Sequence, residues 1–213
     1  MYIPGHFSVG AEASLHALIR SASFATLISA ASGGPNEAPW VSHVPLLLDP
    51  AAGERGTLYG HVARANEHWR CFDGARPHLA IFHGPHTYIS PSWYARPDAA
   101  VPTWNYAVVH AHGTARTIES RDRVLELLDR LVAAHEARFD APWSLKLEGR
   151  ALEAMLGAIV WFEIPVSRLE GKFKLSQNRS ELDRAGVIAM LEQSEDAGDR
   201  RVAALMRAAA TAA

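Results

Sequence analysis

The sequence predicts a mainly β protein, a β-barrel with peripheral helices, from three observations. Most of the first two-thirds consists of short apolar runs rich in β-branched and aromatic residues, separated by turn-forming glycine, proline and asparagine. Helical periodicity is confined to a few segments between and after these runs. The 213 residues, 48% of them hydrophobic, suffice to bury one substantial core. We therefore expect one domain, or one domain with a small helical appendage.

Six segments are expected to be strands, and the first two form a hairpin across a turn signal at 32–36. Gly113 indicates a bulge or a close backbone approach in the fifth strand. Pro165 indicates an edge position or a bend in the sixth. The six segments are 24–31, 40–48, 57–62, 78–83, 108–118 and 158–168.

Helices are expected between and after the strands. Asn66 is placed to cap a short helix that ends at Cys71, and Ser180 with Asp183 resembles a capping box. Asp199 is expected to cap the final helix. The clearest helix, 121–138, carries apolar side chains at the spacing of a buried stripe. The remaining helices are 11–20 and 180–191.

Composition excludes several function classes. The net charge is −2 and the pI about 6.6, so direct DNA binding gains no support, because duplex binding depends on a basic excess. The single cysteine, Cys71, permits neither an internal disulfide nor a cysteine-cluster metal site, and its apolar context favours a buried thiol. No P-loop, dinucleotide fingerprint or nucleophile elbow is present. With no signal-peptide pattern and no long apolar run, we expect a cytoplasmic protein.

The segment 172–179 is the densest source of hydrogen-bond donors in the chain. Such a set suits an anionic, polar-edged ligand such as a nucleotide phosphate. The alternative is a solvated basic turn. A second basic position is Arg64, where a strand meets a short helix and a guanidinium can meet a phosphate. His61 nearby is better explained as a structural histidine.

The segment 84–105 is expected to be a long irregular loop, dense in proline and aromatic residues, and such loops are usually functional or part of an interface. Its aromatic and hydroxyl side chains suit a planar heteroaromatic ligand. The alternative is a dimer interface, and both can hold if the ligand lies between subunits.

Histidines offer a weaker signal. His110 and His112 alternate on one strand and therefore share a face, which is a workable metal-ligand geometry. No carboxylate or cysteine nearby in the sequence completes a site, so no metal is expected.

Five segments together resemble the PaiB-type FMN-binding negative transcriptional regulators, a family with an FMN-binding split-barrel fold. They occur in order through nearly the whole chain: Met1-Tyr2-Ile3-Pro4 with His6-Phe7, His61-Val62-Ala63-Arg64-Ala65-Asn66, Tyr88-Ile89-Ser90-Pro91-Ser92-Trp93-Tyr94, Val101-Pro102-Thr103-Trp104-Asn105-Tyr106 and 169–179. One departure is Glu67, which stands where the family often has proline.

The resemblance implies a homodimer with FMN in clefts between the subunits. It makes Arg64, Lys172 and Lys174 candidates for contacts to the phosphate. Trp93 and Trp104 become candidates for contacts to the flavin ring or to the facing subunit. It also places the split-barrel domain at 1–179 and a C-terminal helical extension, packed on the barrel or on the partner subunit, at 180–213. Further polar contacts to the cofactor are implied for Ser92, Thr103, Asn105 and Gln177.

Two other functions stay open at this point. Split barrels with FMN often perform two-electron chemistry, so a flavin-dependent oxidoreductase acting on a small molecule is the first alternative. A haem-binding or haem-degrading split barrel is the second, and it would need an axial ligand from the histidines. Whether the protein is an enzyme is not decided by the sequence.

Overall fold

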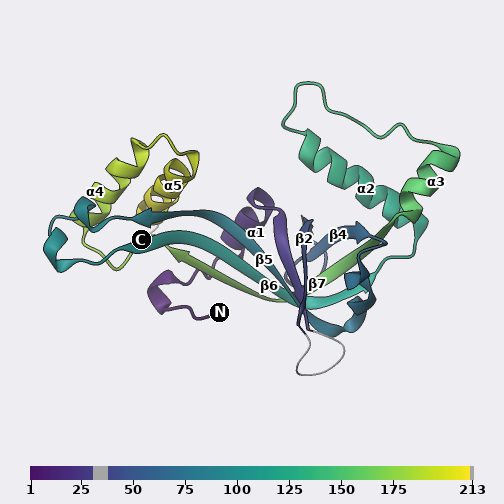
Figure 1. The fold of residues 1–213 in the computed structure, drawn as a ribbon, viewed down its shortest axis with the longest axis horizontal. Coiled ribbons are helices and arrows are strands. Elements are labelled where there is room, and N and C mark those ends of the chain that lie inside the picture. The colour runs from purple at the N-terminus through teal and green to yellow at the C-terminus, as the bar shows by residue number, and fades with distance from the viewer. Residues whose placement is uncertain (31–37, 212–213) are drawn as a thin grey trace. The chain divides into compact units, whose positions relative to one another are not determined.

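The computed structural model describes residues 1–30 and 38–211, so the turn expected at 32–36 lies outside the described residues. Strands among these residues form one seven-stranded sheet in the order β2-β1-β5-β6-β7-β4-β3 (Figure 1). The pairings β1–β2, β1–β5, β3–β4 and β4–β7 are antiparallel. The strands are β1 (Phe24–Ser29), β2 (Trp40–Pro45), β3 (Leu47–Asp49), β4 (Thr57–Ala63), β5 (Asp73–Ile89), β6 (Thr103–Thr117) and β7 (Ile159–Lys174).

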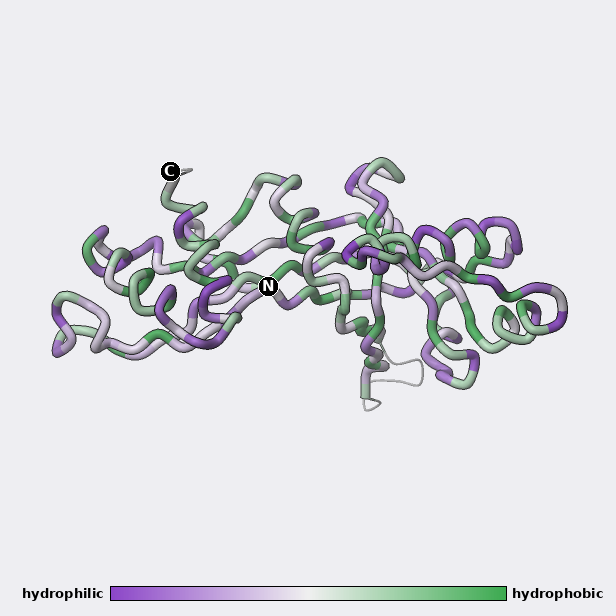
Figure 2. The backbone as a smooth tube through the Cα atoms, turned by 90° about the horizontal axis from the view of Figure 1, so that it is seen from above, coloured by the Kyte–Doolittle hydropathy of each residue, from purple (hydrophilic) through white to green (hydrophobic). Residues whose placement is uncertain are grey.

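Helices lie at the beginning, between β6 and β7, and at the end of the described chain. They are α1 (Glu12–Ser21), α2 (Arg121–Glu136), α3 (Gly149–Gly157), α4 (Glu181–Glu192) and α5 (Ala197–Thr211). Short 3₁₀ turns are η1 (Gly5–Phe7), η2 (Glu67–Cys71), η3 (Pro91–Trp93) and η4 (Pro97–Ala99). Within residues 1–30 and 38–211, none of the helices combines the length and the apolar character that crossing a membrane requires. Figure 2 shows hydrophilic and hydrophobic stretches alternating along the helices.

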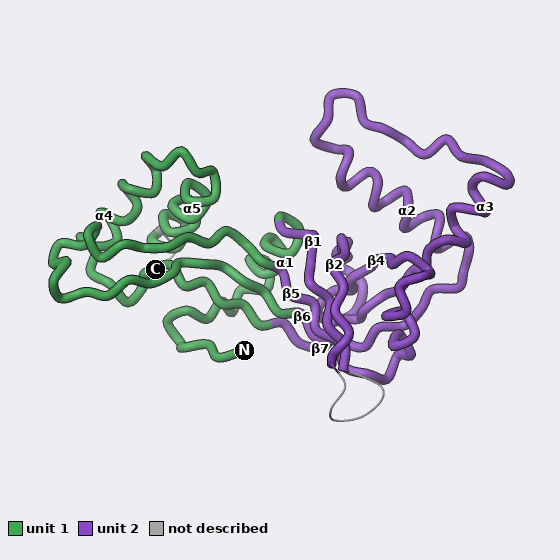
Figure 3. The backbone as a smooth tube through the Cα atoms, viewed as in Figure 1, with its two compact units in different colours: residues 1–21, 83–110, 170–213 green, residues 22–82, 111–169 purple. Residues whose placement is uncertain are grey.

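The chain divides into two units, which Figure 3 distinguishes by colour. Unit 1 comprises residues 1–21, 83–110 and 170–213, and unit 2 comprises residues 22–82 and 111–169. The three longest strands, β5, β6 and β7, contribute to both.

In unit 2, α2 packs on the sheet through the apolar stripe expected from its sequence. Val124, Leu127 and Leu131 are buried against Tyr59 of β4 and Trp161 of β7. Ser120 caps the helix by accepting a hydrogen bond from the Arg123 N–H. The helix expected at 121–138 is therefore confirmed, with its end at Glu136.

In unit 1, α4 and α5 form a core with the strand ends. Its buried members come from α4, from α5 and from the segments around β5 and β7: Ile89, Tyr94, Leu175, Val187, Ile188, Leu191, Val202, Ala203 and Met206. Ser180 caps α4 through the Asp183 N–H, as expected. The expected Asp199 cap is wrong, because α5 begins earlier, at Ala197. Asp196 instead accepts from the Gly198 N–H at 2.6 Å.

The three longest strands, β5, β6 and β7, extend further than the sequence indicated. The loop expected at 84–105 is shorter, because β5 continues to Ile89 and β6 begins at Thr103. Pro85 suggested a break, since proline lacks an N–H. Pairing with β1, however, ends at Ile81, so Pro85 need not donate to that strand. The segment expected as one strand at 40–48 is two, β2 pairing with β1 and β3 with β4.

Gly113 and Pro165 mark a close approach of β6 and β7 in unit 2. A Cβ at Gly113 would collide with the Pro165 carbonyl oxygen, so the close approach expected from the glycine is confirmed. The edge position considered for Pro165 is wrong, because β7 lies between β6 and β4. Proline is accepted there because its partner, Thr57, is the first residue of β4.

A buried histidine forms a polar network inside unit 2. His68 is fully buried, with Nε2 2.6 Å from Ser29 Oγ and Nδ1 2.8 Å from Ser42 Oγ. Asn66 donates to Ser42 Oγ at 3.0 Å and accepts from the His68 N–H, the cap expected from the sequence. Burial, with a smaller effect from nearby His78, lowers the pKa of His68 to about 4.

Candidate functional site

The segment that follows Gly171 presents alternate side chains to two different cavities of unit 1. Lys174, Ser176 and Asn178 line a small polar cavity, named here the basic pocket. Phe173, Leu175 and Gln177 line a separate, mainly apolar cavity with α1 and α5. The extended backbone of β7 directs Phe173 and Lys174 to opposite sides, and the turn at 175–179 directs the side chains that follow. The expected cluster at 172–179 is thus divided, and only half of it faces the basic pocket.

The basic pocket has a volume of about 140 Å³. That is small beside the roughly 300–1,000 Å³ of drug-sized ligand sites, and it suits a compact charged group. Among the described residues, the pocket is lined by two cations, Lys174 and Arg179, and by no carboxylate. The complete lining is Phe7, Tyr94, Val101, Thr103, Asn105, Lys174, Ser176, Asn178 and Arg179.

Lys174 is held at the pocket wall by β6. Its ammonium donates to Thr103 Oγ1 and, at 2.8 Å, to the Trp104 carbonyl oxygen. Burial lowers the pKa of Lys174, and repulsion from Lys172 and Arg179 lowers it further. Attraction to an anion in the pocket would favour the charged ammonium and so oppose both effects, which makes the site electrostatically suited to a negative ligand.

Asn105 supports the pocket from behind. It is fully buried, and its amide group donates to Ser176 Oγ at 3.0 Å and to Met206 Sδ at 3.4 Å. Ser176 has φ +65°, a left-handed conformation that serine rarely adopts, and it is fixed by this contact. These contacts are to protein groups, and the contact to the cofactor expected of Asn105 stays a prediction.

Other residues expected in the site lie apart from the basic pocket within unit 1. Gln177 closes its own turn, donating to the Phe173 carbonyl oxygen at 2.6 Å and accepting from the Leu175 N–H at 2.7 Å. Ser92 pairs with Ser90 at 2.8 Å between hydroxyls. Trp93 packs against the core around α4 and α5.

Lys172 and Trp104 lie with an exposed group of aromatic rings. The Lys172 ammonium lies 5.4 Å from the ring centre of Tyr2 and 5.5 Å from that of Tyr106. Trp104 is 53% exposed and meets Tyr88 edge-on with ring centres 6.2 Å apart. We call Tyr2, Tyr88, Trp104 and Tyr106 the aromatic surface of unit 1.

Arg64 belongs to unit 2. Its guanidinium donates to the carbonyl oxygens of Gly157 at 2.6 Å and Ile159 at 3.0 Å. It lines a cavity of about 470 Å³ whose walls also carry the Arg121–Glu153 ion pair. Its two backbone contacts give Arg64 a structural role at the end of α3, and its expected phosphate contact stays a prediction.

Arg179 and Tyr94 are residues of the pocket that were not named individually as ligands. Arg179 was visible in the basic segment, but its position at the pocket depends on the turn at Ser176. Tyr94 lies in an aromatic-rich segment whose members the sequence could not rank. Its hydroxyl is buried and has no hydrogen-bond partner among the described residues, which singles it out.

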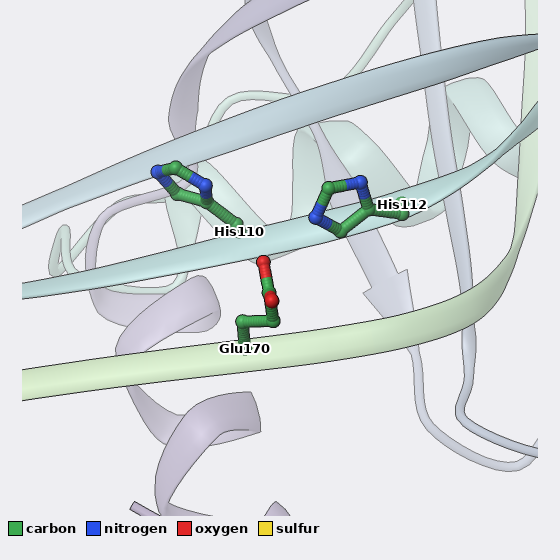
Figure 4. A group of neighbouring side chains, drawn as sticks. All are labelled: His110, His112 and Glu170. Carbon is green, nitrogen blue, oxygen red and sulfur yellow. The ribbon is translucent and has the colours of Figure 1, made fainter. Parts of the chain in front are cut away.

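The histidine on β6 in unit 1 does have a carboxylate nearby, contributed by β7. Figure 4 shows the Glu170 carboxylate turned toward the strand that carries His110 and, two residues on, His112. Ligand atoms of His110 and Glu170 lie within 4.8 Å of each other. Glu170 already pairs with the Met1 amino group at 3.1 Å. This neighbour was not evident from the sequence, because Glu170 lies on a different strand.

Comparison with known proteins decides the family. Residues 1–168 match the family model described as "Putative FMN-binding domain". The chain belongs to this family. The protease synthase and sporulation protein PAI 2 of Bacillus subtilis (strain 168) is 36% identical over 208 residues, 97% of this chain and 96% of that protein. The uncharacterized protein AN0679 of Emericella nidulans is 30% identical over 193 residues, 74% of this chain and 77% of that protein. The PaiB-type resemblance is confirmed, as is FMN as the cofactor of this family.

Solved structures confirm the split-barrel fold expected for an FMN-binding domain family member. The FAD and heme binding protein from Mycobacterium smegmatis has a TM-score of 0.60 at 15% identity, covering 84% of this chain and 78% of that one. The flavocytochrome Anf3 from Azotobacter vinelandii has a TM-score of 0.56 at 15% identity, covering 84% and 75%. At these identities the likeness concerns the fold alone.

The residues of the basic pocket fit one end of FMN. A phosphate monoester is an acceptor of hydrogen bonds with up to two negative charges, and the pocket offers ammonium, guanidinium, amide and hydroxyl groups. The flavin ring is too large for the pocket and would have to lie outside it.

Proposed function

We propose that this protein binds FMN with the phosphate in the basic pocket of unit 1. The observation that carries the proposal is the pairing of Lys174 and Arg179 around a small cavity without a carboxylate. Lys174 supplies charge at a fixed position, and Arg179 supplies a planar fork that can bind phosphate oxygens in pairs. Thr103 orients Lys174. When bound, FMN supplies a ring that accepts and releases electrons, and the protein holds and orients it.

The same proposal includes a homodimer that covers the aromatic surface. Tyr2 is 82% exposed, Trp104 53% and Tyr88 45%. The amino-acid composition of the chain is otherwise ordinary. Aromatic rings are enriched in subunit interfaces. FMN bound near such an interface would meet rings from both subunits, the arrangement that the family resemblance implies.

The dimer is expected to depend on Trp104. Changing Trp104 to serine removes the largest ring of the aromatic surface, so the dimer should dissociate at protein concentrations where the original chain stays paired. Sedimentation velocity over a dilution series measures this. A matched change at exposed Trp143 in unit 2 is the control. Equal dimerisation by the Trp104 variant and the original chain would count against this interface.

The biological role that we propose is regulatory. Support comes from the relative in Bacillus subtilis, which is named as a protease synthase and sporulation protein. With a net charge of −2, control of gene expression would be indirect, through a partner protein or through the state of the flavin. The helical extension at 180–213 is the proposed contact region, and the cytoplasmic location stays a prediction.

An absorption titration tests the cofactor. Full-length protein at micromolar concentration is mixed with FMN, with riboflavin, which lacks the phosphate, and with haem. We expect the FMN bands to shift and saturate, with riboflavin binding more weakly, since it leaves the basic pocket without its anion. A haem Soret shift without FMN binding would replace the proposal by the haem-binding alternative.

A further inference from the structure

The hydroxyl of Tyr94 is a buried donor without a partner. Tyr94 is 5% exposed, and its hydroxyl oxygen makes no hydrogen bond to any described residue. Buried hydroxyls are nearly always paired, because an unpaired one loses its bonds to water without replacement. The Arg179 guanidinium lies over the Tyr94 ring, 4.7 Å from its centre. A ring that lies under a cation at the wall of the basic pocket, and whose buried hydroxyl is unpaired among the described residues, points to a ligand atom as the missing partner.

Tyr94 also connects the basic pocket to a second cavity at the start of α4. This cavity, the α4 pocket, has a volume of about 250 Å³ and shares both Tyr94 and Arg179 with the basic pocket. Its other polar walls are Arg96, Ser180 and Asp183. The Asp183 carboxylate is already engaged, accepting from the Ala95 N–H at 2.9 Å. The N-terminal end of a 12-residue helix adds a positive field to this side.

The residues that line the two pockets are also the residues that hold α4 and α5. The Tyr94 ring belongs to the same buried core as Val187 of α4 and Val202 of α5. Asn105 reaches α5 through Met206 Sδ. The Ala95–Asp183 bond attaches the first turn of α4 to the same segment. Tyr94 therefore shares one core with both helices, and Arg179 directly precedes Ser180, the cap of α4.

We propose that the phosphate of the bound ligand closes onto Tyr94 and Arg179 and thereby fastens the α4–α5 pair to unit 1, so that the pair reports occupancy of the site. The inference rests on the proposed function and extends it to regulation. It identifies the phosphate, rather than the ring, as the group that controls the helices. The α4–α5 pair is then the element through which a partner would sense bound FMN.

Hydrogen–deuterium exchange of the full-length protein tests this coupling. At an FMN concentration about 100 times Kd, exchange that requires release of the ligand slows about 100-fold. We expect this slowing across 181–211 with FMN and much less with riboflavin at the same multiple of its own Kd. Equal protection by both ligands, or FMN binding with unchanged exchange in α4–α5, would overturn the inference and leave FMN binding intact.

Tyr94→Phe separates the hydroxyl from the ring. We expect FMN binding to weaken about tenfold, the loss of one hydrogen bond to a charged group, and the protection of α4–α5 to shrink. Because the hydroxyl has no partner among residues 1–30 and 38–211, the variant without ligand should melt no lower than the original chain. Tyr59→Phe, which removes a tyrosine hydroxyl in unit 2, away from both pockets and from the aromatic surface, is the matched control for FMN affinity. Unchanged FMN affinity in Tyr94→Phe overturns the inference, and absence of FMN binding to the original chain overturns both proposals.

Discussion

Changing Lys174 to methionine is expected to weaken FMN binding about 100-fold, on the order of 3 kcal/mol, the upper range for a hydrogen bond to a charged group. Methionine keeps much of the aliphatic volume and removes the ammonium that donates to Thr103 and Trp104. The pocket would keep Arg179 as its only cation. Fluorescence titration with FMN measures the loss.

Riboflavin distinguishes lost phosphate binding from local damage. Its affinity should change far less in the Lys174 variant, because riboflavin has no phosphate to lose. The same substitution at Lys146, an exposed residue of unit 2, is the matched control in a chain with only three lysines. A Lys174 variant that loses both ligands equally would point to a structural role for this residue.

Acidification from pH 6.5 to pH 4 is expected to lower the free energy of unfolding by about 3 kcal/mol through His68 alone. The folded chain keeps His68 neutral down to a pKa of about 4, whereas the unfolded chain takes up the proton near pH 6.5. Protons therefore favour the unfolded state throughout this window, and each pKa unit is worth 1.36 kcal/mol. Burial also lowers the pKa of His78, which acts in the same direction. Urea unfolding at a series of pH values measures how the free energy of unfolding changes with pH.

His68→Gln isolates this contribution. Glutamine does not titrate, so its variant should show a shallower decline of stability between pH 6.5 and pH 4, even if it is less stable at neutral pH. In His135→Gln, at an exposed position on α2, the free energy of unfolding should decline with falling pH as steeply as in the original chain. If the His68 variant loses stability between pH 6.5 and pH 4 as steeply as the original chain, His68 is not the residue responsible for the loss.

Local sequence signals predicted the elements that are stabilised by residues close to one another in the chain. Asn66 and Ser180 cap their helices as expected, and the stripe on α2 is buried. α3 was missed because it is only nine residues long and its N-cap residue, Glu148, makes no side-chain cap. The length of β5 was underestimated because Pro85 suggested a break. Whether proline is tolerated at this position depends on which strand lies beside it, and that neighbour is set by the tertiary structure.

The candidate site was predicted in composition and only partly in geometry. The motifs identified the family, and Lys174, Thr103 and Asn105 lie together at the basic pocket. Gln177 faces the other side of the segment, because it lies in the turn after β7 and hydrogen-bonds to Phe173 and Leu175. Arg179 and Tyr94 meet only because the turn at Ser176 returns the chain, with a positive φ that the residue type does not predict. The unpaired Tyr94 hydroxyl has no sequence signal at all.

A crystal structure of the full-length protein with FMN tests the central claim most directly. We predict the phosphate in the basic pocket, with one oxygen about 3 Å from Lys174 Nζ and others near Arg179 and the Tyr94 hydroxyl. A phosphate bound elsewhere, for example at Arg64 in unit 2 with Lys174 still turned to Thr103, would contradict it.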